Sequence, residues 1–274
     1  MKKRVPYRIN NNCRNGIVAI LLCFTLVPAS FAQTTLKNWN TAQANLSVTR
    51  KLDFKIGYLK AFNLNNGFTS DFSQASISAD YDITKHFTVS SGVVLGTYSK
   101  TNDANRVLLR VAYKTRVAGI LTWTNSLQAE VHSNTQTHYK ERIIYSTRIG
   151  TRKRLTALKL APSVAYALYY NIGGKPIQYY DKNNQPAVQS SPDGFHRGRL
   201  YFNLNSRLSR YFSLTLYYMM QREFNLFTNQ YHAMNVTNPA NGKIVRPFND
   251  YNVIGTTLTV NINIYKKKDH NTEN

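Results

Sequence analysis

The chain has 274 residues, of which 42% are hydrophobic, and its 35 Lys and Arg against 13 Asp and Glu residues give a net charge of +22. Both cysteines, Cys13 and Cys23, lie in an N-terminal segment that we expect to be removed, which excludes disulfides and thiolate metal sites from the mature chain. No later segment has the roughly 18 continuous apolar residues of a membrane helix. An exported chain without a recognisable nucleic-acid module also argues against nucleic acid as the partner of the basic charge.

The first expected element is a cleavable secretory signal peptide over residues 1–32. Basic residues without any acid precede an apolar run over residues 17–27, and a small-residue cleavage site ends at Ala32. Removing the five basic residues of this leader leaves a charge of +17 on residues 33–274. That charge indicates either a basic surface or lumen that meets anions, or bases in turns and at a membrane rim that face lipid phosphates.

Apolar and polar side chains then alternate with period two in eleven segments, which predicts β-strands with one apolar and one polar face. The clearest example is Arg199–Glu223, where two such runs meet at a tight break, as in an antiparallel hairpin. Runs of about 10 to 12 residues are long for soluble strands but suit tilted strands that cross a bilayer. In chain order, the expected strands cover residues 42–48, 52–58, 75–81, 87–95, 107–113, 121–131, 143–149, 158–168, 199–208, 212–223 and 251–265.

The connections between these strands alternate between tight turns and looser loops, and the longest loops are 171–196 and 224–249. Outer-membrane barrels have this pattern, with short periplasmic turns and long outside loops, and they close because an open edge would leave unpaired amides in lipid. A soluble β-sandwich is the alternative, but strand length, leader and polar inner faces argue against it. We therefore expect an all-β fold, a transmembrane antiparallel β-barrel over residues 33–265, followed by a charged flexible tail over 266–274.

The strand count raises a conflict, because eleven clear strands do not match the even number of single-chain bacterial barrels. The alternation of turns also makes the first clear strand run towards the periplasm. We therefore expect a further strand from residues around 33–40, which gives about 12 strands, with 10 as the fallback.

Several stretches carry a resemblance to a known family: Gln128–His132, Arg142 and Arg148, the strand Leu160–Asn171, Arg197–Tyr201 with the hairpin that runs to Glu223, and Trp39 ahead of LDFKIGYLKAF. In these residues the chain resembles the outer-membrane barrel family catalogued as domain of unknown function 2490, found mainly in Bacteroidetes. The resemblance covers most of the mature chain as a diffuse pattern. It implies a lipid-embedded barrel and leaves the function unassigned. One departure is that nine residues follow Tyr265, whereas many outer-membrane barrels end on an aromatic residue.

Charged residues gather on the polar faces that we expect to line the lumen. They allow two interpretations: a basic pore lining that favours anionic or polar solutes, or a lumen plugged by ion pairs, with Glu130 facing Arg142 or Arg148 across a hairpin. The expected basic residues of the lumen are Arg110, Lys114, Arg142, Arg148, Arg152, Lys159, Arg199 and Arg207, and the acidic ones are Asp80, Asp82, Glu130 and Glu223.

Catalytic and metal sites have weaker signals. The only adjacent histidine and serine of the mature chain are His132 and Ser133, and neighbours on a strand point to opposite faces, so we expect no enzyme. His132 and His138 flank one loop, but two loop histidines are ordinarily solvated, so we expect neither a metal nor another cofactor. Tyrosines on the apolar faces predict an interfacial aromatic girdle, and Tyr179–Tyr180 in the long loop could stack on a sugar.

The sequence thus predicts a protein of the cell outer membrane without assigning its specific role. A narrow channel for small polar or anionic solutes is the first candidate. The second is a surface-binding or adhesion barrel that acts through the two long loops, and the third is an outer-membrane hydrolase. The expected partners are outer-membrane lipid and lipopolysaccharide, the barrel assembly machinery during biogenesis, and small polar or anionic solutes. We expect a monomer that binds no nucleic acid.

Overall fold

The fold is all-β. Among the described residues no helix is long and apolar enough to cross a membrane. The expected signal peptide over 1–32 and the tail over 266–274 lie outside the described residues. The structure, a computed structural model, describes residues 35–65, 67–98, 105–117, 119–133, 135, 138–155, 159–227, 233–245 and 247–265.

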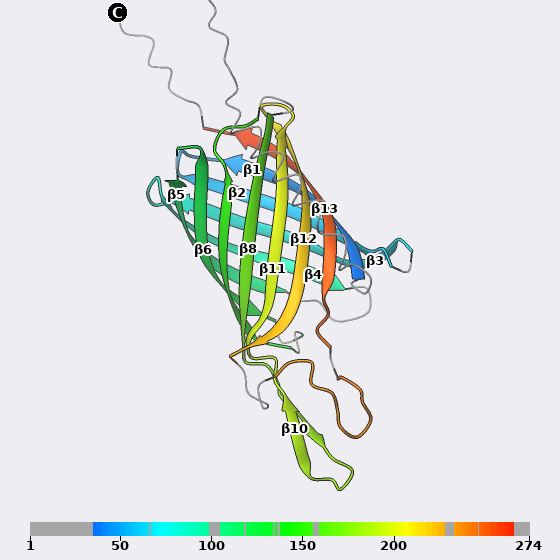
Figure 1. Cartoon of the computed structure of the whole chain (residues 1–274). Helices are drawn as coiled ribbons and strands as arrows, with labels where there is room; N and C mark the ends of the chain where they lie inside the picture. Colours follow the sequence, from blue (N-terminus) through cyan, green and yellow to red (C-terminus); the bar gives the residue numbers. More distant parts are fainter. Residues whose placement is uncertain are drawn as a thin grey trace, which may run out of the picture. The chain divides into compact units, whose positions relative to one another are not determined.

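Eleven strands close into one barrel, and two short strands form a separate hairpin (Figure 1). The barrel strands have 11 to 15 residues, which is long enough for tilted strands to cross a hydrocarbon core. The hairpin strands are β9 (Ile177–Tyr180) and β10 (Pro186–Ser190). The barrel strands are β1 (Thr35–Ser47), β2 (Leu52–Asn63), β3 (Thr69–Asp82), β4 (Phe87–Tyr98), β5 (Arg106–Val117), β6 (Leu121–His132), β7 (Glu141–Thr151), β8 (Leu160–Ile172), β11 (Gly194–Arg207), β12 (Phe212–Leu226) and β13 (Tyr251–Asn263).

The barrel closes through a parallel pair, β1 with β13, whereas its other neighbouring strands are antiparallel. Directions that alternate around a ring with an odd number of strands must repeat once, so eleven strands require one parallel contact. The expectation of an all-β barrel of this size is confirmed, but the purely antiparallel pairing is corrected by the parallel β1–β13 contact. The described residues form no twelfth barrel strand. Residues 35–40 are the first part of β1, which continues without a break to Ser47.

The period-two alternation separates apolar from polar side chains. Along β5, Val107, Leu109 and Val111 point outwards and are exposed, while Arg106 and Arg110 alternate with them and are partly covered. Closure makes these two faces unequal, because the inner face can pair charges and the outer face can only meet surrounding solvent or lipid. The strand sequences therefore build a barrel with an apolar outside and a polar inside.

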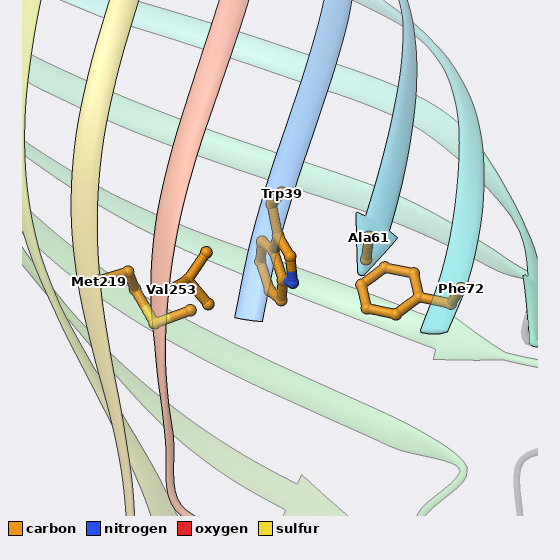
Figure 2. Packing of buried hydrophobic residues seen from close by; sticks show 5 residues of the cluster. All are labelled: Trp39, Ala61, Phe72, Met219 and Val253. Atoms are coloured by element: carbon orange, nitrogen blue, oxygen red, sulfur yellow. The ribbon is translucent and has the colours of Figure 1, made fainter. Parts of the chain in front are cut away.

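An apolar band covers part of the inner wall, in the half of the barrel that carries the long loops. Figure 2 shows its buried members in a row across the parallel seam, with the ring of Trp39 between Val253 and Ala61. The ring of Trp39 packs edge-on against Phe72, with 5.5 Å between the ring centroids. The band consists of Trp39, Ala61, Phe72, Met219 and Val253, and Tyr201 packs against both this band and a second cluster of Ile144, Ala167 and Tyr169.

The two long connections contact each other. The backbone N–H of Val245 donates to the hydroxyl of Tyr179 in β9 at 3.2 Å, and that of Ser191 donates to the carbonyl of Ala233 at 3.0 Å. The segment expected as an irregular loop over 171–196 therefore contains a hairpin that is tied to the loop after β12.

Candidate anion-binding chamber

A cavity of about 620 Å³, here called the chamber, lies where the loop-side strand ends meet residues of the connecting loops. This volume is within the usual range for small-molecule pockets. Residues of β1, β2, β3, β5, β6, β7, β11, β12 and β13 contribute to its wall, so closure of the barrel is what assembles it. Its cationic side chains are Lys37, Arg106, Arg142, Arg197 and Arg199.

Glu130 on β6 is the centre of a buried ion-pair cluster beside the chamber. Its register partner on β7 is Arg142, whose Nε and Nη2 donate to Glu130 Oε2 at 3.0 and 2.5 Å. Arg106 Nε lies 3.4 Å from Glu130 Oε1, and His132 Nε2 lies 3.2 Å from Oε2. Of the two partners that the sequence left open for Glu130, the structure therefore selects Arg142.

A second ion pair joins β11 and β12. Arg197 and Glu223 are register partners, and Arg197 Nε lies 2.5 Å from Glu223 Oε1. Gln221, two residues away on the same inner face, donates from Nε2 to Glu223 Oε1 at 2.7 Å. The Arg197 charge is thus compensated at the wall of the chamber.

A third ion pair depends on an irregularity in β3. The pairing of β2 with β3 passes over Asp71, since Phe72 pairs with Ala61 and Ser70 pairs with the next residue of β2. A β-bulge of this kind re-aims side chains, and the Asp71 carboxylate lies 2.7 Å from Lys37 Nζ. Strict alternation would not have predicted that Asp71 lines the chamber.

Arg199 is different, because it is the one cation of the chamber wall that makes no ion pair among the described residues. Its Nε donates to Gln221 Oε1 at 2.8 Å, and its Nη2 donates to the Tyr251 hydroxyl at 3.1 Å. The guanidinium carbon lies 5.6 Å from the ring centre of Trp39 and 5.1 Å from that of Tyr169. Neutral amide, hydroxyl and ring groups therefore position this charge without neutralising it.

The chamber wall has an excess of positive charge. Its five cations face three carboxylates, those of Asp71, Glu130 and Glu223. Glu130 forms ion pairs with both Arg106 and Arg142. Within the described part of the chain, Asp71 is the only one of the three carboxylates that lines the cavity itself. An anion entering the chamber would meet uncompensated positive charge.

A separate polar cluster lies further along the interior, towards the tight turns. Asp80 on β3 lies 2.5 Å from Lys55 Nζ and 3.5 Å from Arg110 Nη2, and Arg110 also donates to Ser90 Oγ at 2.9 Å. Arg148 on β7 donates from Nε to an inner-face serine of β8 at 3.1 Å. Asp80, Arg110 and Arg148 therefore lie outside the chamber.

The remaining residues expected to line the lumen lie at the turn side. Lys114, Arg207 and Asp82 are exposed near the turn ends of their strands. Arg152 follows β7 in a turn, and Lys159 precedes β8 with a positive φ of 49°, so neither belongs to a strand. The structure thus places Arg142 and Arg199 at the chamber and these five residues at the periphery.

Sequence reasoning missed Lys37, Trp39, Arg106 and Arg197 as residues of the chamber. Continuing the period-two alternation backwards from Ala42 would have put Lys37 and Trp39 on the inner face of β1. The alternation in β5 likewise puts Arg106 on the inner face with Arg110. The expected twelfth strand separates residues 33–40 from β1, which is why Lys37 and Trp39 are not among the expected lumen residues.

The candidate catalytic and metal-binding residues have other partners. His132 contacts Glu130, and Ser133 Oγ lies 2.6 Å from Thr135 Oγ1. The ring of His138 packs edge-on against Phe248, with 4.7 Å between the ring centroids. Within the described ranges, no group of three or more His, Cys, Asp or Glu side chains has a geometry that could hold a metal ion.

The fold and the chamber together define a closed β-barrel with a basic pocket inside its loop-side end. A scan of the sequence against protein-family models and a search of curated proteins found no match.

Proposed function

We propose that this chain is an integral β-barrel of the bacterial outer membrane whose chamber takes up small anionic solutes. Four features support the membrane location: the export leader expected from the sequence, strands of 11 to 15 residues, tight turns that alternate with long loops, and an apolar outer face. The resemblance to the barrel family of unknown function agrees with it.

The observation that carries the solute preference is the charge of the chamber. Five cations face three carboxylates around a cavity of about 620 Å³, and the unpaired Arg199 lines it. Cationic rings and clefts lined by one sign of charge raise the local concentration of counter-ions and select anions in membrane pores. Between the chamber and the tight turns, the inner faces of the strands remain polar. Their residues include Gln43, Asn45, Asn203 and Thr215.

The test is the conductance of the purified, refolded protein in planar bilayers, with the reversal potential measured under a salt gradient. We expect stepwise openings and a reversal potential that indicates anion selectivity. A heat-modifiable, folded barrel that never conducts would contradict a channel. Cation selectivity would contradict the role assigned to the chamber.

A second candidate function, surface binding through the loops, is favoured by one observation. The β9–β10 hairpin and the loop after β12 form a tied structure, in which Tyr179 and Met234 are buried. Loops that pack against each other are better suited to present a fixed surface than independent loops. Deleting residues 177–190 while the barrel stays folded would abolish binding to a cell-surface or polysaccharide ligand under this candidate, and would leave conductance selectivity unchanged.

A further inference from the structure

The chamber contains two donors that point to a particular kind of ligand, and this inference rests on the proposed uptake of anions. The first donor is Arg199, whose charge is held by neutral groups. Gln221 is 1% exposed and stands between Arg199 and Glu223, accepting from the one and donating to the other. A guanidinium fixed in this way presents a planar set of donors to an incoming acceptor.

The second donor is the indole of Trp39. Trp39 lines the chamber and is 8% exposed, yet its Nε1–H has no hydrogen-bond partner. Buried polar groups nearly always have a partner, and an indole can only donate. A group that satisfies this N–H therefore has to be an acceptor. Because the Trp39 ring also stacks with Arg199, both donors belong to one part of the chamber wall.

The other residues of the chamber wall indicate which chemical groups the rest of the ligand carries. Phe72, Tyr139, Phe248 and Tyr251 line the same cavity, so flat apolar groups would find aromatic partners there. Arg106 and Arg142 share Glu130, and Arg197 pairs with Glu223. Among the described residues, Arg199 is therefore the guanidinium of the wall without a carboxylate partner and the position for a negative group of the ligand. Inorganic phosphate would bring no flat apolar group to these aromatic side chains.

We propose that the chamber binds an aromatic monocarboxylate. The carboxylate of this ligand accepts from Arg199 and from the Trp39 Nε1–H, and the ring of the ligand lies among the aromatic side chains. Benzoate is the simplest probe of this chemistry. Three matched compounds separate its parts: benzyl alcohol keeps the ring without the charge, acetate keeps the carboxylate without the ring, and inorganic phosphate offers a different anion.

The chain provides its own spectroscopic reporter. Its two tryptophans are Trp39 in the chamber and Trp123 on the outer face of β6, where the side chain is exposed. Trp123→Phe therefore leaves Trp39 as the only tryptophan. In this refolded variant we expect a saturable change of Trp39 emission with benzoate, and at least about tenfold weaker binding of benzyl alcohol, acetate and phosphate because each lacks part of the recognition. Equal binding of benzyl alcohol or phosphate would overturn the proposal.

Substitution then tests each donor. In the Trp123→Phe background, Arg199→Gln should weaken benzoate binding by about tenfold or more, because it removes the charge-assisted hydrogen bonds. Arg210→Gln is the matched control: Arg210 also stacks on an aromatic ring, that of Tyr211 at 4.5 Å, but lies at the opposite end of the strands. Trp39→Phe keeps a ring and deletes the donor, and calorimetry should show about a tenfold loss with wild-type folding.

Failure to fold is controlled by a conservative variant. If Arg199→Gln is not heat-modifiable, Arg199→Lys is used instead, because it keeps the charge without the planar set of donors. This variant should bind benzoate more weakly than its Trp123→Phe parent, but still measurably. Unchanged benzoate affinity in a folded Arg199 variant would overturn the site. Anion-selective conductance without benzoate binding would overturn this inference and leave the proposed function standing. Arg199-dependent benzoate binding without conductance would support this inference and contradict the proposed channel.

Discussion

Glu130 and Arg142 lie opposite each other on β6 and β7, and two N–H groups of Arg142 donate to the same oxygen of Glu130, at 3.0 and 2.5 Å. The residues are only 3% and 7% exposed. Gln128 Nε2 donates to the other Glu130 oxygen at 2.7 Å, and Arg142 Nη1 donates to the Tyr139 hydroxyl at 2.7 Å. Such surrounding hydrogen bonds are what allow a buried ion pair to be tolerated. The buried cluster around Glu130 is thus the kind of ion-pair network expected in a plugged lumen. Arg199, which has no carboxylate partner among the described residues, is instead the kind of residue expected in a basic lining.

Glu130→Gln should destabilise the barrel strongly. The change leaves Arg142 and Arg106 without their carboxylate, and removing one partner of a buried pair costs about 3 to 5 kcal/mol. Urea unfolding in lipid vesicles, followed by tryptophan emission, measures the free energy of unfolding. Glu141→Gln is the control, because Glu141 is exposed at the start of β7 and its loss should change stability by less than about 0.5 kcal/mol. Equal effects of the two changes would contradict the cluster.

Arg148→Glu should shift ion selectivity towards cations. Arg148 donates to Ser163 Oγ on the inner face at 3.1 Å and makes no ion pair among the described residues, so the substitution replaces an interior positive charge with a negative one. The reversal potential under a salt gradient measures the change, and Arg148→Gln should give about half the shift, since it removes one unit of charge instead of two. If neither selectivity nor unfolding free energy responds, the side chain does not face the interior.

A cysteine pair should report the parallel closure. Asn45 of β1 and Asn261 of β13 are register partners whose side chains hydrogen-bond at 3.0 Å. Because both native cysteines lie at positions 13 and 23, Asn45→Cys with Asn261→Cys places the only two thiols in the residues after 32. Oxidation should form a disulfide that is visible as a mobility shift on non-reducing gels. Asn45→Cys with Thr257→Cys is out of register and should not cross-link, and a barrel with a twelfth strand between β1 and β13 would cross-link neither pair.

Gly255→Ala should destabilise the barrel through a steric conflict with Tyr217. A Cβ atom at Gly255 would overlap with the Tyr217 ring, which packs over this glycine from β12. Overpacking typically costs about 1 to 3 kcal/mol, which urea unfolding would detect. In a Tyr217→Ala background the same glycine substitution should cost much less, because the conflicting ring is gone. A cost that is independent of the background would show that the ring is not the cause.

The strand pattern was predictable because alternation is local: each residue's inner or outer side follows from its neighbours, as Val107 and Arg110 show on β5. A pairing of Glu130 with an arginine of the next strand could also be anticipated, since a hairpin keeps partners close in sequence, but the choice of Arg142 over Arg148 came from the register. Asp71 could not be placed in this way, because a bulge moves one residue out of the alternation without a clear mark in the sequence.

The sequence by itself determined the all-β class, the approximate positions of the eleven barrel strands and the separation of apolar outer from polar inner faces, since these depend on period-two patterns within short segments. Only the tertiary structure decided the number of strands and their closure, because whether residues 35–40 extend β1 or form another strand depends on which edge they meet. The same closure brings Trp39 of β1 beside Arg199 of β11, a contact across 160 residues of sequence. Ring closure, which no local pattern encodes, thereby creates the chamber.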